Sequence, residues 1–140
     1  MVRYIVRYIV RVEVCHARHL ARAVVSPAAA VVVLTEPAPF EALAIKGPAA
    51  VEDTEELQDA AALHTLRLTA TLACRAALPQ GPLALRLTAA DGTRWLMGAS
   101  VRPFPTVVQK DTRPARPSEV AAVTLTATLS GPLPLLEVKG

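Results

Sequence analysis

The sequence predicts a mainly β protein: an antiparallel β-sandwich or barrel with one or two short helices. The first observation is that several segments alternate apolar and polar residues with the period of a strand, while one segment has a helix-capping pattern. The second is that the 140 residues are 52% hydrophobic, enough for one domain with a core that needs no disulfide or metal. This composition excludes a disordered chain. An aromatic content of 4% also argues against a stacking platform for single-stranded nucleic acid.

The first expected strand covers residues 2–14, where the two faces differ in chemistry. Even-numbered positions hold valine or tyrosine, whereas odd-numbered positions carry Arg3, Arg7 and Arg11 with isoleucines between them. Successive arginines are about 13 Å apart on a strand. Such a face could follow phosphates, contact a partner protein, or protect an exposed edge strand by charge. Because the formal net charge is only +3, nucleic acid is the least favoured of these partners.

The next segments are assigned from the prolines that end them and from continuous stretches of apolar residues. Residues 15–25 predict a short helix that ends before Pro27, and residues 28–35 predict a strand buried on both faces. Residues 40–46 predict a short strand. Residues 51–62 are the best helix candidate, or else an acidic loop, because Asp53 and Glu56 have the spacing of an N-cap and its capping acid.

The second half of the chain predicts a hairpin and a threonine-rich strand. Strands are expected at 66–73, 83–88 and 120–129. Asp91-Gly92 is a typical hairpin turn. As the two central turn residues they would place Leu87 opposite Leu96 and Arg86 opposite Met97. Large apolar groups then lie on both faces, so we expect this hairpin to be covered on both sides.

A proline-rich segment at about 101–117 is expected to form an extended arm or long loop within the single domain 1–140. Its prolines fix φ and remove backbone donors, so it cannot enter the middle of a sheet. We expect the arm to contact another subunit, with a solvated loop as the alternative. The candidate protein-contact residues are Arg102, Phe104, Val107, Val108, Lys110, Arg113 and Arg116.

Potential metal ligands occur together at Cys15, His16 and His19. A closed zinc site takes four ligands, and no fourth is nearby in the sequence. With only Cys15 and Cys74 present, a disulfide scaffold is not expected, and two free buried thiols are. The sequence therefore predicts no metal site and no cofactor.

Catalytic chemistry is not expected either. His64 could act as a general base oriented by Glu56 or Asp59, with Ser26 or Cys74 as nucleophile. No spacing supports such an arrangement, and the signatures of hydrolases and nucleotide-binding loops are absent from the sequence. We expect His64 to be a polar residue at the start of a strand and the protein not to be an enzyme.

No secretory or membrane-spanning segment is expected. Arginines interrupt the first apolar residues, and the longest apolar run covers only residues 28–34. The sequence predicts a protein of the cytoplasm or of a virion, with no membrane partner.

Residues 91–98 read DGTRWLMG, residues 102–105 read RPFP and residues 110–114 read KDTRP. This combination resembles small structural proteins encoded in prophages of gut Bacteroidetes, over about residues 91–138. The resemblance implies a tail, neck or connector component without catalytic residues. Such a component would contact other copies of itself and other virion proteins, in or on a symmetric ring. The alternative is a small β-fold module that binds a ligand or protein through an apolar pocket near Trp95.

Overall fold

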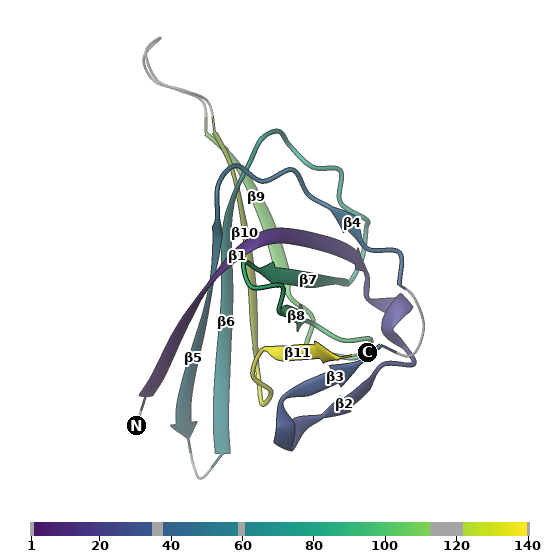
Figure 1. Ribbon diagram of the computed structural model, residues 1–140, viewed down its shortest axis with the longest axis vertical. Helices are drawn as coiled ribbons and strands as arrows, with labels where there is room; N and C mark the ends of the chain where they lie inside the picture. Colours follow the sequence, from purple (N-terminus) through teal and green to yellow (C-terminus); the bar gives the residue numbers. More distant parts are fainter. Residues whose placement is uncertain (1, 35–37, 59–60, 113–121, 140) are drawn as a thin grey trace.

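The computed structural model describes residues 2–34, 38–58, 61–112 and 122–139, and these residues are mainly in β-strands (Figure 1). The mainly β prediction is confirmed, and the helices are two 3₁₀ turns. The elements are β1 (Val2–His16), η1 (Ala17–Leu20), β2 (Val24–Ser26), η2 (Pro27–Ala29), β3 (Val31–Val33), β4 (Glu41–Ala42), β5 (Ala49–Gln58), β6 (Ala61–Leu72), β7 (Leu83–Ala89), β8 (Arg94–Met97), β9 (Thr106–Thr112), β10 (Ala122–Gly131) and β11 (Leu136–Lys139).

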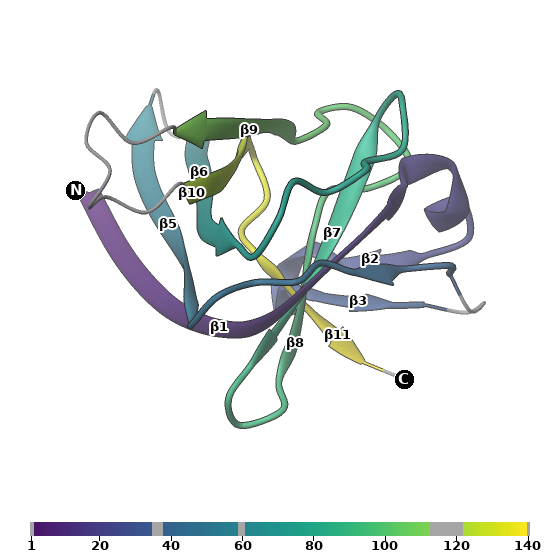
Figure 2. The same ribbon diagram turned by 90° about the horizontal axis from the view of Figure 1, so that it is seen from above.

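The strands form one open sheet that folds into two layers. Its order is β2-β3-β11-β8-β7-β1-β5-β6-β10-β9, with β4 paired to β1. The first layer contains the N-terminal half of β1 with β5, β6, β10 and β9. The second contains the C-terminal half of β1 with β7, β8, β11, β3 and β2. Figure 2 shows β1 curving from one layer into the other.

A β-bulge in β1 produces this change of layer. The register with β7 shifts between Ile9 and Arg11, which leaves Val10 as the extra residue. Before the bulge the odd-numbered Ile9 is buried and the even-numbered positions are exposed. After the bulge the even-numbered Val12 and Val14 are buried. Glu13 and Cys15 are buried as well, so β1 is covered on one face before the bulge and on both faces after it.

The acidic segment 51–62 is a strand and not a helix, so that prediction is wrong. Residues 49–58 form β5, which lies between β1 and β6 in antiparallel pairing. Val51 and Asp53 face the core with period two, and the Asp53 carboxylate lies 3.1 Å from Nδ1 of His64 on β6. Because the partner of Asp53 is a tertiary neighbour, the local capping pattern was misleading.

The segment between β1 and β4 also differs from expectation. β1 continues to His16, and of the helix predicted over residues 15–25 only Ala17–Leu20 is helical, as a single 3₁₀ turn. The strand expected at 28–35 is reduced to Val31–Val33, of which only Val32 is buried. Ala30, at φ 53°, ends the second 3₁₀ turn and shortens this strand.

The hairpin at Asp91-Gly92 has a longer loop than predicted. The Gly92 N–H donates to the Ala89 carbonyl, and the Ala89 N–H donates to the Thr93 carbonyl. Gly92 therefore occupies the positive-φ position after a type I turn, at φ 90°. Leu87 lies opposite Trp95 and not Leu96, one position from the predicted register.

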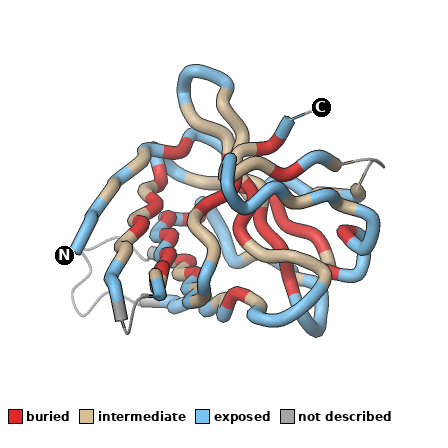
Figure 3. The backbone as a smooth tube through the Cα atoms, turned by 90° about the horizontal axis from the view of Figure 1, so that it is seen from below, coloured by how far each residue is buried: buried red, intermediate tan, exposed pale blue. Residues whose placement is uncertain are grey.

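The expectation that both faces of this hairpin are covered is confirmed. Leu85, Leu87 and Met97 belong to the main core between the layers. Ala84 and Leu96 belong to a second core, on the other side of the second layer, with Cys15, Leu20, Val32, Leu136 and Val138. Figure 3 shows buried backbone concentrated where the two layers meet.

The prediction that residues 101–117 form an arm or long loop is wrong for residues 106–112, whereas residues 101–105 belong to no strand or helix. Thr106–Thr112 is strand β9, paired with β10 along its length. Pro103 and Pro105 precede the strand, so they remove no donor from it. β9 lies at the end of the sheet order, which agrees with the rule that excludes proline-flanked segments from its middle. Residues 113–117 lie outside the described residues.

Candidate functional site

Those of the predicted protein-contact residues that the structure describes differ in exposure. Arg102, Val108 and Lys110 are exposed. Phe104 and Val107 are half-buried, and Val107 packs against the main core. The alternation of β9 thus separates these side chains onto two faces. Arg113 and Arg116 lie outside the described residues.

The cysteine and histidines near residue 15 have separate surroundings. Cys15 is buried, and burial raises the pKa of its thiol to about 11. His16 is half-buried, and its Nδ1 accepts a hydrogen bond from the Arg18 N–H at 3.1 Å, whereas His19 is exposed. In residues 2–34, 38–58, 61–112 and 122–139, no three His, Cys, Asp or Glu side chains are close enough to hold a metal ion.

His64 is paired with Asp53, which the sequence did not single out as its partner. Of the two acids considered from the sequence, Asp59 lies outside the described residues. The side chains of His64 and Asp53 are 10% and 7% exposed, and they lie on adjacent strands. Ser26 is on β2, at the opposite end of the sheet from β6. Cys74 is exposed, contrary to the expectation that both thiols are buried. The structure therefore brings no nucleophile of that set to His64.

A partly buried ion pair joins β1 to β7. Nε and Nη2 of Arg86 donate to the two carboxylate oxygens of Glu13, at 3.0 and 2.8 Å. The Phe40 ring lies 4.5 Å from the same guanidinium. Glu13 is buried, and the bidentate pair compensates the cost of removing its charge from water. This arrangement satisfies both charged groups and joins neighbouring strands.

The most unusual surface is the outward face of the N-terminal half of β1. Its five apolar or aromatic side chains, which we call the β1 stripe, are strongly exposed. They are Val2 at 62%, Tyr4 at 56%, Val6 at 40%, Tyr8 at 70% and Val10 at 50%. A hydrogen bond to Glu52 on β5 raises the pKa of Tyr4, so this hydroxyl stays a donor. The sequence showed that this face of the strand is apolar, but only the structure shows that the face is exposed.

The same half of β1 has an unpaired edge. Residues 2–9 pair with β5 on one side, and pairing with β7 on the other side begins only at Ile9. Among the described residues no strand covers the second edge of Val2–Tyr8. Figure 1 shows this end of β1 leaving the body of the protein beside β5. An exposed apolar stripe therefore coincides with a row of free backbone hydrogen-bonding groups.

Two buried donors lie behind this edge. The Arg7 guanidinium lies 4.3 Å from the centre of the Trp95 ring. Nη1 of Arg7 and Nε1 of Trp95 are both buried, and the described structure offers neither an acceptor. Trp95 packs against the main core. Trp95 is not among the residues that line the apolar cavity at Val25 and Leu136.

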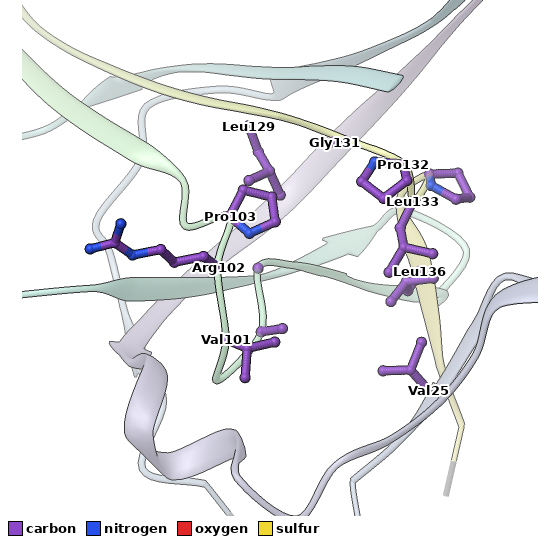
Figure 4. A pocket seen from close by; sticks show the side chains of 12 residues that line it. Val25, Val101, Arg102, Pro103, Leu129, Gly131, Pro132, Leu133 and Leu136 are labelled. Carbon is purple, nitrogen blue, oxygen red and sulfur yellow. The ribbon is translucent and has the colours of Figure 1, made fainter. Parts of the chain in front are cut away.

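An apolar cavity lies elsewhere, between β2, the end of β10 and the 98–103 loop (Figure 4). Its volume is about 150 Å³. The lining includes the apolar residues Val25, Pro103, Leu129, Leu133 and Leu136. In Figure 4 the Arg102 side chain extends away from the cavity. The space suits a small aliphatic group and offers it no charged partner.

No protein-family model, no curated protein and no solved structure matches this chain. Within the described part of the chain, no helix has the length and apolar character needed to cross a membrane.

Proposed function

We propose that this protein is a non-enzymatic assembly protein, a phage or prophage tail, neck or connector component, that docks to other chains through the N-terminal half of β1. One observation carries the proposal: the β1 stripe lies on a strand whose second edge is unpaired. A partner strand added at this edge would gain main-chain hydrogen bonds. The exposed tyrosines and valines would supply the specific side-chain contacts.

The exposure of this strand is the reason for a docking role. Natural sheets protect long apolar edges, because such edges join other chains. The N-terminal half of β1 instead presents alternate valines and tyrosines that are 40–70% exposed. Tyrosine is favoured in contact surfaces because it buries a large area with few rotatable bonds. The phage assignment is supported by the resemblance over residues 91–138.

The test replaces Tyr8 with lysine. We expect Tyr8→Lys to fold but to lose assembly, either with itself or with the products of the neighbouring genes, because a charge cannot be buried in an apolar contact. The measurement is co-purification after co-expression, followed by size exclusion with light scattering.

Val101→Lys is the matched control. Val101 is exposed to a similar extent, at 67%, but lies outside β1. The Val101→Lys variant should therefore assemble like the wild-type protein. If wild-type protein associates with none of these chains, or if Tyr8→Lys assembles as well as Val101→Lys, the proposal is wrong.

The apolar cavity supports a second candidate function, the binding of a small aliphatic ligand. Its 150 Å³ could hold a short alkyl chain among Leu129, Leu133 and Leu136. Titration with short alkanols should then give saturable chemical-shift changes at these leucines. Leu133→Trp should fill the space and abolish the changes, whereas Tyr8→Lys should not affect them. Linear, unsaturable shifts would show that no such site exists.

A further inference from the structure

We propose that the free edge of β1 is occupied by β9 of a second copy of this chain, with the two strands parallel, so that copies join head to tail into a closed ring. This inference rests on the proposed function, because it names the partner of the same surface.

The two edges belong to one continuous run of strands. In the order β1-β5-β6-β10-β9, the two ends are the N-terminal half of β1 and β9, and among the described residues each of these pairs with a strand on one side only. The free part of β1 is Val2–Tyr8, and β9 is Thr106–Thr112, a strand of 7 residues. The lengths therefore match, and joining them would continue the sheet from one copy into the next.

The directions of the two strands also suit a ring. Four successive pairings link β1 to β9, and all four are antiparallel. Two strands separated by four reversals run the same way. A rotation about an axis along the strands preserves this direction, so the β1 of one copy would meet the β9 of the next in parallel. Contacts between different surfaces of identical chains close into rings in this way.

One alignment of β1 with β9 of the next copy places suitable side chains beside each other on both faces of the joined sheet. In this alignment Tyr4 lies beside Val108, and Val6 lies beside Lys110. The exposed faces of both strands then lie on the same side of the joined sheet. On the inner face Arg7 then lies beside Asp111, which is exposed in the isolated chain. Asp111 would give Nη1 of Arg7 the acceptor that the single copy does not supply.

Pairing of β1 with β1 of a second copy is less favourable. An antiparallel arrangement that uses the whole free edge puts Val2 opposite Tyr8. Arg3 then lies directly opposite Arg7, twice by symmetry. Like charges directly opposite each other destabilise a strand pair. The edge of β9 avoids this repulsion and replaces it with an attraction to Asp111.

The experiment is disulfide cross-linking in a Cys74→Ser background, so that the buried Cys15 is the only native thiol. Val6→Cys and Lys110→Cys, mixed as two single variants, should form cross-linked dimers on oxidation. Both substitutions in one chain should give a ladder that ends at the ring size. Val6→Cys mixed with Val24→Cys is the control, because Val24 is 55% exposed but lies on β2. This control should give no cross-link.

Charge exchange is the second readout. Arg7→Glu and Asp111→Arg should each weaken self-association at least about tenfold, and the double variant should restore most of it. Circular dichroism of each variant checks that it is folded.

Three outcomes would overturn the inference. These are cross-linking by Val6→Cys alone, assembly without any 6–110 cross-link, and a monomer at the highest attainable concentration. None of them removes the proposed function if Tyr8→Lys still abolishes binding to the product of a neighbouring gene.

Discussion

The two cysteines show how much the surroundings of one residue decide. Cys15 is 2% exposed in the second core, whereas Cys74 is exposed just after β6. Burial disfavours the thiolate of Cys15 and raises its pKa to about 11, although the nearby Arg86 guanidinium acts in the opposite direction. Because the thiolate is the reactive form, Cys15 should be inert at neutral pH.

We expect a thiol reagent at pH 8 to label Cys74 quickly and Cys15 only when the protein unfolds. Cys74→Ser is the control and should leave the folded protein unlabelled. The raised pKa also makes a prediction about stability. The unfolded thiol ionises near pH 9 and the folded one near pH 11, so the free energy of unfolding should fall as the pH rises across this interval. Rapid labelling of Cys15 in the native protein would contradict its burial.

At the scale of elements, turns and bulges decide where the strands place their side chains. The bulge at Val10 changes which residues of β1 face the main core, from the odd-numbered Ile9 before it to the even-numbered Val12 after it. The turn before β8 depends on Gly92, whose φ of 90° is rarely adopted by residues with a side chain. A Cβ at Gly92 would meet no atom within 4 Å, so only the backbone conformation requires glycine here.

Gly92→Val should destabilise the protein by about 1–3 kcal/mol, since a β-branched residue at positive φ is strained. The midpoint of urea unfolding measures the loss. Gly92→Asn is the control and should cost less, because asparagine tolerates this region of φ and ψ. Equal midpoints for wild type and Gly92→Val would mean that the turn adopts another conformation.

At the scale of the whole molecule, the open sheet is not uniformly supported. β6 pairs along most of its length with β5 on one side and β10 on the other. β2 pairs only with β3, and β3 joins the rest of the sheet through a short parallel pairing with β11. The strands around β6 in the first layer are therefore joined by more backbone hydrogen bonds than β2 and β3 in the second layer.

Amide hydrogen exchange should reflect this difference. We expect amides in the middle of β6 to exchange at least about a hundredfold more slowly than those of β2 and β3, because β2 and β3 can open without disrupting the main core. Exchange followed by NMR or mass spectrometry measures both regions in one experiment. Equal protection of β2 and β6 would show that the sheet opens as one unit.

The sequence by itself determined the mainly β class, the strand of residues 2–14, the threonine-rich strand that became β10 and the positive-φ glycine at 92. It also indicated that the hairpin around it is covered on both faces. These features follow from local rules, because alternation with period two and the conformational freedom of glycine depend only on neighbouring residues.

Only the tertiary structure decided which half of each pattern is buried. The acidic segment became β5 because β1 and β6 flank it and His64 meets Asp53. The β1 stripe is exposed in the half of the strand that β7 does not pair with, whereas both faces of β1 are buried after the bulge at Val10. The apolar cavity forms where residues from Val25 to Leu136 converge. A local pattern states that a strand has two faces, but the side that faces solvent depends on partners far away in the chain.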